Sequence, residues 1–289
     1  MFRKAERKQA RLRLALTGPS GSGKTLSALL MAQGLGGTIA VIDTERGSSE
    51  LYSDQVEFDV MQLNPPYSPE RYIEAIRAAE AAGYTTLIID SYSHEWTGAG
   101  GCLEINDQIA RAKYKGNTWS AWNETTPRHR ALTDAILASP LHIICTMRSK
   151  TETVQGEGKK ILKLGMKTEQ RDGTDYEFTV VLDLTHDGHE AVASKDRTRL
   201  FNQPELIGIE TGHKLLAWLN DGASPEQRAG EQVVDAIADI LAAPDMHALQ
   251  SAFNAAKDIS RGFPSLTERV VQAKDQRKAE LQPDPNQAA

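Results

Sequence analysis

The sequence predicts an α/β fold in which helices cover a mainly parallel β-sheet, followed by a small C-terminal helical appendage. Short apolar runs alternate with segments of helical spacing from residue 12 to residue 146, the pattern of parallel strands joined by helices. A glycine-rich turn joins the first apolar run to the first helical segment. Beyond residue 222 the apolar residues keep helical spacing alone, so this part is expected to be all-helical.

The composition is that of a globular protein. The 289 residues are enough to bury a sizeable core and to carry an appendage. Hydrophobic residues make up 40% and charged residues 25%, which excludes a wholly disordered chain. The net charge of −6 excludes a globally basic coat for nucleic acid, but it is compatible with a local basic groove.

Cysteine content and hydropathy favour a cytoplasmic location. The two cysteines, Cys102 and Cys145, cannot form a disulfide framework, so a reducing compartment is expected. The longest apolar runs are far shorter than the roughly 20 residues that cross a bilayer, so no membrane partner is expected. The first residues are basic and are not followed by an apolar segment of the kind found in signal peptides.

The elements of the core follow in a clear order. Apolar runs predict strands at residues 12–17, 38–43, 58–63, 85–90 and 141–146. Helical spacing predicts helices at residues 24–34, 70–82 and 128–138, and Gly83 closes the second of them. Residues 178–184 and 190–194 predict an antiparallel pair around a turn at 187–188. Between residues 91 and 127 no period is evident, so an irregular stretch is expected.

Changes of composition divide the chain into four parts. Residues 1–13 hold six basic side chains and one acidic side chain and are expected to form a basic N-terminal tail. The α/β core is expected at residues 14–222, and two or three helices at 223–282. Residues 283–289 are expected to be a disordered tail. The helical region is predicted from one recurring set of apolar side chains: Val233, Ile237, Ile240, Leu241, Leu249, Phe253, Leu266 and Val270.

The glycine-rich turn matches the phosphate-binding pattern G-x-x-x-x-G-K-[ST] completely, and it lies between a strand and a helix as that motif requires. Its glycines let backbone N–H groups approach a phosphate, and the helix adds its positive N-terminal dipole. Lys24 is expected to reach the terminal phosphates of ATP, and the Thr25 hydroxyl to bind Mg²⁺. A chance glycine turn is the alternative. The predicted nucleotide-binding residues are Gly18, Pro19, Ser20, Gly21, Ser22, Gly23, Lys24 and Thr25.

An acidic residue should complete the metal site that Thr25 begins. Asp90 ends the apolar run Leu-Ile-Ile-Asp and is predicted to hold Mg²⁺ together with Thr25, although a turn aspartate would look the same. The next residue is Ser91, where many ATPases place the glutamate that activates water. Glu45, at the end of the strand after the phosphate-loop helix, is therefore the first candidate for this base, and Glu95 is the second.

Six segments resemble the RecA-like ATPases, over roughly residues 10–220, and more narrowly the phage-encoded members with AAA-type domains that bind and anneal single-stranded DNA. The segments are Gly18-Pro-Ser-Gly-Ser-Gly-Lys-Thr25, Ile42-Asp-Thr-Glu-Arg-Gly47, Asp90-Ser-Tyr-Ser-His-Glu-Trp96, Thr146-Met-Arg-Ser-Lys-Thr151, Tyr176-Glu-Phe178 and Lys195-Asp-Arg-Thr198.

This resemblance implies a hydrolase that links ATP turnover to single-stranded DNA in phage recombination, in the host cytoplasm. It implies self-association into a ring or filament with ATP between protomers, and a single-strand DNA-binding protein as a further partner. Lys195 and Arg197 would then act on the neighbour's ATP and, with Lys24 and Glu45, form the catalytic set. A surface ion pair with Asp187 or Glu190 is the alternative for these two cations. Thr146 stands where RecA has a glutamine that senses the γ-phosphate, so weaker coupling to DNA is expected.

Residues 145–171 form a local basic segment, with seven basic side chains against three acidic ones, at the position of the main DNA loop of RecA. Gly156 and Gly158 are expected to make its tip flexible. Cations bind phosphates and aromatic faces stack on bases, so this segment and Trp119 are predicted to bind DNA. A solvated hairpin is the alternative, and Trp119 and Trp122 could instead anchor a helix. The predicted DNA-binding residues are Arg148, Lys150, Lys159, Lys160, Lys163, Lys167 and Trp119.

Two other functions remain open on the sequence. A P-loop small-molecule kinase would need an arginine-rich lid over an acceptor pocket, which the sequence does not show. A nucleotide-dependent scaffold or remodelling factor for proteins would suit the acidic helical region. His94 could contact the γ-phosphate side of the site or be a buried structural histidine, and the spacing of His94, His129 and His142 does not fit a metal site.

Overall fold

The computed structural model describes residues 4–155 and 161–282, and between residues 151 and 166 it describes the backbone only. Residues 11–219 form one compact unit. Residues 1–10 and 220–289 form a second unit, which is described separately below.

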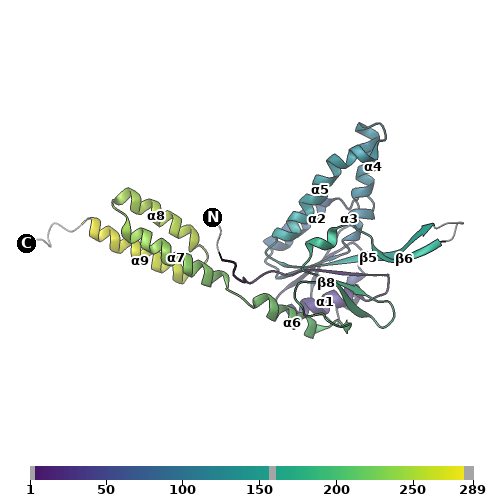
Figure 1. The fold of residues 1–289 in the computed structure, drawn as a ribbon, viewed down its shortest axis with the longest axis horizontal. Helices are drawn as coiled ribbons and strands as arrows, with labels where there is room; N and C mark the ends of the chain where they lie inside the picture. The colour runs from purple at the N-terminus through teal and green to yellow at the C-terminus, as the bar shows by residue number, and fades with distance from the viewer. Residues whose placement is uncertain (1–3, 156–160, 283–289) are drawn as a thin grey trace, which may run out of the picture. The chain divides into compact units, whose positions relative to one another are not determined.

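A mainly parallel sheet forms the centre of the first unit (Figure 1). Its strands lie in the order β3-β2-β4-β5-β1-β7-β8-β9, and every pair from β3 to β7 is parallel. The strands β8 and β9 continue the sheet in antiparallel pairs. Their bounds are β1 Arg13–Gly18, β2 Ile39–Asp43, β3 Asp59–Gln62, β4 Thr86–Asp90, β5 His142–Gln155, β7 Val180–Leu184, β8 Glu190–Asp196 and β9 Glu205–Leu206. The predicted α/β fold class is confirmed.

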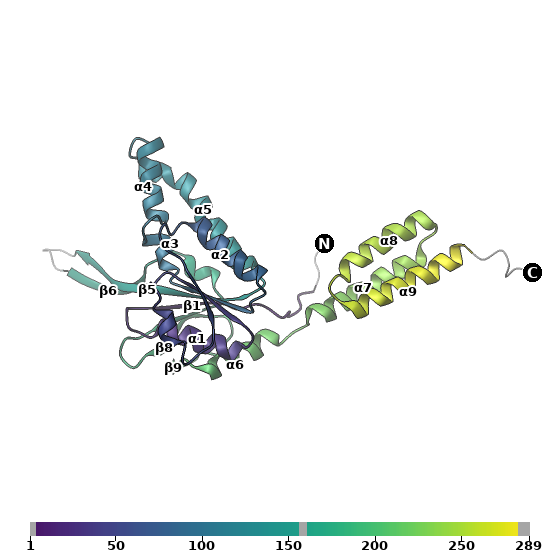
Figure 2. The ribbon, with the colours of Figure 1, turned by 180° about the vertical axis from the view of Figure 1, so that it is seen from behind.

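Helices cover both faces of this sheet (Figures 1 and 2). On one face α1 (Lys24–Leu35) and α6 (Ile209–Asn220) pack, and on the other α2 (Pro69–Ala81) and α5 (Thr118–Ala138). Successive side chains of β1 point to opposite faces of the sheet. Leu14 and Leu16 belong to the core under α1 and Ala15 to the core under α2, so both faces of the strand are apolar. A strand buried on both faces reads as a continuous apolar run, which is the signal that predicted the sheet.

The stretch expected to be irregular, residues 91–127, is helical, so this prediction was wrong. It contains α3 (Ser93–Thr97), α4 (Cys102–Lys113) and the first half of α5. The helix α5 begins at Thr118, where the Asn117 side chain accepts a hydrogen bond from the Ser120 amide at 3.1 Å. Pro127 lies inside this helix. Proline is common in the first turn of a helix, so the sequence predicted a helix start near residue 128 and not at Thr118.

The strand expected at residues 141–146 is much longer. The strand β5 runs to Gln155 and pairs in an antiparallel hairpin with β6 (Ile161–Thr168). The first part of β5 lies between β4 and β1 in the sheet, and the last part projects beyond it (Figure 1). The expected antiparallel pair near residue 188 is confirmed as β7 and β8, although β8 ends at Asp196. Short 3₁₀ turns lie at Ser49–Tyr52 and Thr174–Glu177.

The second unit is a helical bundle with its own core. The helices α7 (Pro225–Ala242), α8 (Met246–Ile259) and α9 (Pro264–Leu281) bury one set of apolar side chains, among them Val233, Ile240, Leu249 and Val270. The basic N-terminal segment pairs with the residues before α7, because the Gln9 amide donates to the Ala223 carbonyl at 3.3 Å. Within the described parts of the chain, no helix is long and apolar enough to cross a membrane.

Candidate nucleotide site

The phosphate loop joins β1 to α1, as the motif requires. Gly21 and Gly23 have φ angles of 79° and 88°, in the left-handed region that favours glycine. Gly23 is the N-cap of α1; no side chain caps this end, and the first turn carries no acidic residue. The N-terminal amides and the helix dipole therefore face the loop with no acidic side chain in the first turn of the helix itself, which suits a bound phosphate.

Lys24, the first residue of α1, lies over the same loop. Its ammonium group donates to the carbonyl oxygens of Gly18 and Pro19, at 3.0 and 2.7 Å. Burial lowers the pKa of Lys24, and the nearby carboxylates of Asp90 and Glu45 oppose this shift. The cation and both predicted acids therefore belong to one electrostatic site.

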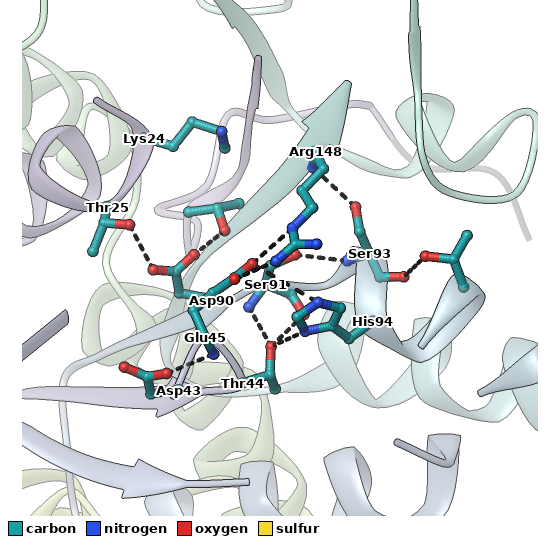
Figure 3. Close-up of polar contacts among 12 residues, drawn as sticks. Lys24, Thr25, Asp43, Thr44, Glu45, Asp90, Ser91, Ser93, His94 and Arg148 are labelled. Carbon is teal, nitrogen blue, oxygen red and sulfur yellow. Dashed lines mark hydrogen bonds and ion pairs between the residues drawn. The ribbon is translucent and has the colours of Figure 1, made fainter. Parts of the chain in front are cut away.

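Asp90, at the end of β4, is the centre of the predicted metal site (Figure 3). The residue is 2% exposed, and its carboxylate accepts hydrogen bonds from Thr25 Oγ1 at 2.7 Å and from the Thr146 hydroxyl. Burial raises the pKa of Asp90, while these two hydroxyl hydrogen bonds lower it. The strand order explains why Asp90, Thr146 and Thr25 lie together, because β5 lies between β4, which ends at Asp90, and β1, which leads to Thr25. Hydroxyl and carboxylate oxygens are the ligands that Mg²⁺ prefers, so Thr25 and Asp90 could hold this ion.

Glu45 follows the end of β2 in a turn that Asp43 organises. The Asp43 carboxylate accepts hydrogen bonds from the amides of Glu45 and Ser49, at 2.7 and 3.2 Å. The Glu45 carboxylate in turn pairs with Arg148 in a bidentate manner, with Nε–Oε1 at 2.9 Å (Figure 3). The charge of Glu45 contributes to the pKa of both Lys24 and Asp90, so this candidate base lies beside the phosphate loop.

His94 lies next to this ion pair. Its Nδ1 is 2.7 Å from Thr44 Oγ1, its Nε2 is 4.0 Å from Glu45 Oε1, and its ring stacks on Tyr67 at 5.0 Å. Burial lowers the pKa of His94, and the charge of Glu45 opposes this shift. His94 therefore supports the turn that carries Glu45.

Arg148 was predicted to bind DNA, and the structure places it at the nucleotide end of the β5–β6 hairpin. Its amide donates to Ser93 Oγ at 2.9 Å, and its guanidinium pairs with Glu45. Burial would lower the pKa of Arg148, but the hydrogen bond and charge of Glu45 raise it above its usual value. Arg148 therefore links the candidate base to the strand that continues into the hairpin.

Glu95, the second candidate base, is completely buried in another network. Its carboxylate accepts hydrogen bonds from the Cys102 thiol at 3.0 Å and from Gln170 at 3.2 Å, and it pairs with His129 at 3.0 Å. Glu95, Cys102 and His129 offer ligand atoms within 4.8 Å of one another. Burial raises the pKa of the Cys102 thiol, in agreement with its place as a hydrogen-bond donor to Glu95. The geometry fits an internal hydrogen-bonded network and favours Glu45 as the base.

The two cations expected to serve a neighbouring protomer lie at the end of β8. The Lys195 ammonium donates to the carbonyl oxygens of Asp175 and Tyr176, at 2.9 and 2.5 Å. Arg197 lies one residue beyond the end of the strand and is exposed.

The predicted DNA-binding residues lie at several places. Lys150 on β5 pairs with Glu169 at 3.2 Å, and Lys167 on β6 pairs with Asp172 at 3.1 Å. Trp119 in the first turn of α5 is 85% exposed. Lys159 and Lys160 lie outside the described residues, as do Gly156, Gly158 and the side chain of Lys163.

Sequence reasoning missed two histidines beside the phosphate loop. They belong to the β7–β8 turn, whose sequence is His-Asp-Gly-His. A Cβ atom on Gly21 would lie 3.5 Å from His186 Nε2, and one on Gly23 would lie 3.6 Å from His189 Nδ1. The signal was the histidine pair itself, but its place depends on the pairing of β1 with β7, which the sequence does not show.

This fold and this site define a nucleotide-binding ATPase of the P-loop class. Residues 10–209 match the family model of an AAA domain, and the chain belongs to this AAA domain family. Members of the family generally use ATP and Mg²⁺, in agreement with the residues gathered at the phosphate loop and at Asp90. No curated protein matches this sequence.

Proposed function

We propose that this protein hydrolyses ATP in connection with single-stranded DNA binding, and that it supports DNA annealing in phage recombination. One observation carries the proposal: β5 contributes Thr146 at Asp90 and Arg148 at Glu45, and then continues into the basic hairpin. A single strand therefore joins the hydrolytic residues to the candidate DNA segment. The motif resemblance to DNA-annealing ATPases favours this partner over a protein substrate.

Each residue of the site has a definite chemical task in this proposal. The amides of the phosphate loop and the Lys24 ammonium bind the phosphates, and Thr25 and Asp90 hold Mg²⁺. The metal ion, when bound, neutralises charge on the phosphate oxygens. Glu45 takes the proton of the attacking water as a general base. To do so its carboxylate must exchange the guanidinium of Arg148 for the water.

The test combines nucleotide and DNA binding in the full-length protein. We expect Mg²⁺-dependent ATP binding and hydrolysis that Lys24→Ala abolishes, because this variant loses the cation of the phosphate loop. We also expect binding to labelled oligo-dT that weakens as the salt concentration rises. Each phosphate contact should contribute about −0.7 to the slope of log K against log salt concentration. Duplex DNA of equal length should bind more weakly.

The outcomes separate the candidate functions. Nucleotide binding that survives in a folded Lys24→Ala protein would contradict the assignment of the phosphate loop. ATP hydrolysis without any binding to oligo-dT would contradict the DNA partner. It would favour the scaffold or remodelling function, for which the acidic helical region is the remaining argument from the sequence.

A further inference from the structure

A large cavity of about 900 Å³ lies away from the phosphate loop. One wall comes from α3, α4 and the first turns of α5, and the other from Lys150 and residues 167–172. The helices α4 and α5 and the β5–β6 hairpin extend from the same end of the sheet (Figures 1 and 2). We call this cavity the tryptophan cleft, because Trp96, Trp119 and Trp122 line it.

The three indoles of the tryptophan cleft differ in exposure. Trp96 and Trp122 stack on each other, with centroids 5.4 Å apart and an angle of 19° between the rings. Trp96 also packs its ring against His129 at 5.5 Å, which fixes the pair to the buried network of Glu95. Trp119 is 85% exposed, so its indole faces remain available. Flat aromatic faces stack on nucleic acid bases independently of sequence.

Cations line the opposite wall. The guanidinium of Arg171 lies 5.9 Å from the centre of the Trp122 ring. Lys150 and Lys167 also line the cleft, and Glu169 and Asp172 balance them only in part. Three cations against two carboxylates leave a local positive charge in a chain of net charge −6. Phosphates that flank a bound base would find their counter-charges on this wall.

We propose that the tryptophan cleft binds unstacked bases of single-stranded DNA, with Trp119 as the stacking platform and Lys150, Lys167 and Arg171 beside the flanking phosphates. This inference rests on the proposed function, because it locates the DNA contact of the same protein. Duplex DNA keeps its base faces stacked inside the helix and therefore cannot use the cleft.

The tryptophan cleft is joined to the nucleotide site by hydrogen bonds. Gln170, which lines the cleft, donates from Nε2 to the Tyr92 carbonyl at 3.1 Å. The Tyr92 amide donates to the Thr146 carbonyl at 2.9 Å, and the Thr146 hydroxyl bonds Asp90. A hydrogen-bonded path therefore runs from Gln170 in the wall of the cleft to Asp90.

The experiment measures the binding of two labelled strands of equal length by fluorescence anisotropy. One strand is oligo-dT, and the other has the same phosphates but abasic sugars. We expect the wild-type protein to prefer oligo-dT. In Trp119→Ala the affinity for oligo-dT should fall by about 5- to 150-fold, the range for loss of one stacked base. Affinity for the abasic strand should change less than about twofold, because phosphate contacts are retained.

Tyr176→Ala is the matched control, because Tyr176 is also an exposed aromatic residue, at 72%, and does not line the cleft. It should keep the preference for oligo-dT. If wild type binds both strands equally, or if Trp119→Ala keeps the preference, the tryptophan cleft is not the base site, although DNA binding stands. If wild type binds neither strand, the DNA partner itself is wrong and this inference fails with it.

Discussion

The Glu45 carboxylate is the group on which hydrolysis should depend most directly. We expect Glu45→Gln to lower ATP turnover by about 10²-fold or more, because an amide cannot accept the proton of water. Nucleotide affinity should be retained, since Lys24 and the loop amides remain. Steady-state hydrolysis and equilibrium binding of a labelled nucleotide check the two parts separately.

Glu50→Gln is the matched control for this change. Glu50 is an exposed glutamate in the same connection between β2 and β3, where it accepts a hydrogen bond from Gln62 at 2.8 Å. Its substitution should leave turnover unchanged. If Glu95→Gln stops turnover in a folded protein while Glu45→Gln does not, the base has been assigned to the wrong glutamate.

His142, at the start of β5, makes the stability of the fold depend on pH. The Leu12 amide donates to His142 Nδ1 at 3.1 Å. Burial and the charges of Arg11 and Arg13 lower the pKa of His142 to about 4. In the unfolded chain the pKa is about 6.5. Between these values the unfolded chain binds a proton that the folded chain does not, so the free energy of unfolding falls with decreasing pH.

We therefore expect His142→Gln to reduce the loss of stability on acidification. Between about pH 7.5 and about pH 5, the free energy of unfolding of wild type should fall by about 1–2 kcal/mol more than that of the variant. Glutamine keeps an acceptor for the Leu12 amide, so the two proteins should be similar at the higher pH. Urea unfolding at both pH values checks this. Equal losses in both proteins would show that His142 does not control this decline.

The residues of the nucleotide site differ in how far the sequence reveals them. Lys24 and Thr25 belong to a contiguous motif, Asp90 ends an apolar run and Glu45 lies two residues beyond another, so local patterns were enough to predict them. The pairing of Arg148 with Glu45 joins residues 103 positions apart. It depends on strand order and on the turn that Asp43 organises, neither of which has a local signature.

At the scale of elements, apolar periodicity predicted the strands well and α5 poorly. The buried face of α5 includes Thr125 and His129, which are polar because they bond Asn106 and Glu95. These partners come from α4 and α3, so the burial of this face could not be inferred from the composition of α5. The length of β5 was missed for a related reason, because its outer half pairs only with β6 and is polar.

The crossing of α1 and α6 allows a sharp test of packing. A Cβ atom on Gly212 would lie 2.3 Å from the Met31 carbonyl oxygen and 2.7 Å from Gly34 Cα. We expect Gly212→Ala to lower the free energy of unfolding by about 2–3 kcal/mol, because backbone atoms must move apart. This loss should appear although alanine favours a helix by about 1 kcal/mol over glycine.

Gly208→Ala is the matched control, because a Cβ atom there meets nothing within 4 Å. Gly208 lies directly before α6, so both substitutions report on the same region. Denaturant unfolding of the two variants and wild type provides the measurement. Equal stability of Gly212→Ala and Gly208→Ala would contradict the close approach of the two helices.

At the scale of the whole molecule, the chain contains two units with separate cores. The composition shift near residue 222 indicated the helical region. The sequence did not reveal that residues 1–10 group with residues 220–289. That grouping depends on backbone pairing at Lys8 and Ala223 and on contacts of Arg7 and Gln9 with residues 220–221, which have no local signature.

The last prediction concerns assembly: we propose that ATP hydrolysis needs a neighbouring protomer, which contributes Arg197. Arg197 is exposed, whereas Lys195 is held by backbone carbonyl oxygens of its own chain. An arginine supplied in trans to a P-loop site raises turnover by about 10³–10⁵-fold. Lys24→Ala and Arg197→Ala should therefore both be inactive alone.

Mixing these two inactive proteins should restore activity. Some sites then combine the intact phosphate loop of the Arg197→Ala protomer with the intact arginine of a Lys24→Ala neighbour, about a quarter of all sites in random head-to-tail assembly. Lys24→Ala mixed with Glu45→Gln is the matched control. Lys24 and Glu45 of one site come from the same protomer, so every site in this mixture lacks one of them and the mixture should stay inactive. Hydrolysis is measured in mixtures whose co-assembly is verified by light scattering. If co-assembled Lys24→Ala and Arg197→Ala proteins remain inactive, Arg197 does not act across the interface.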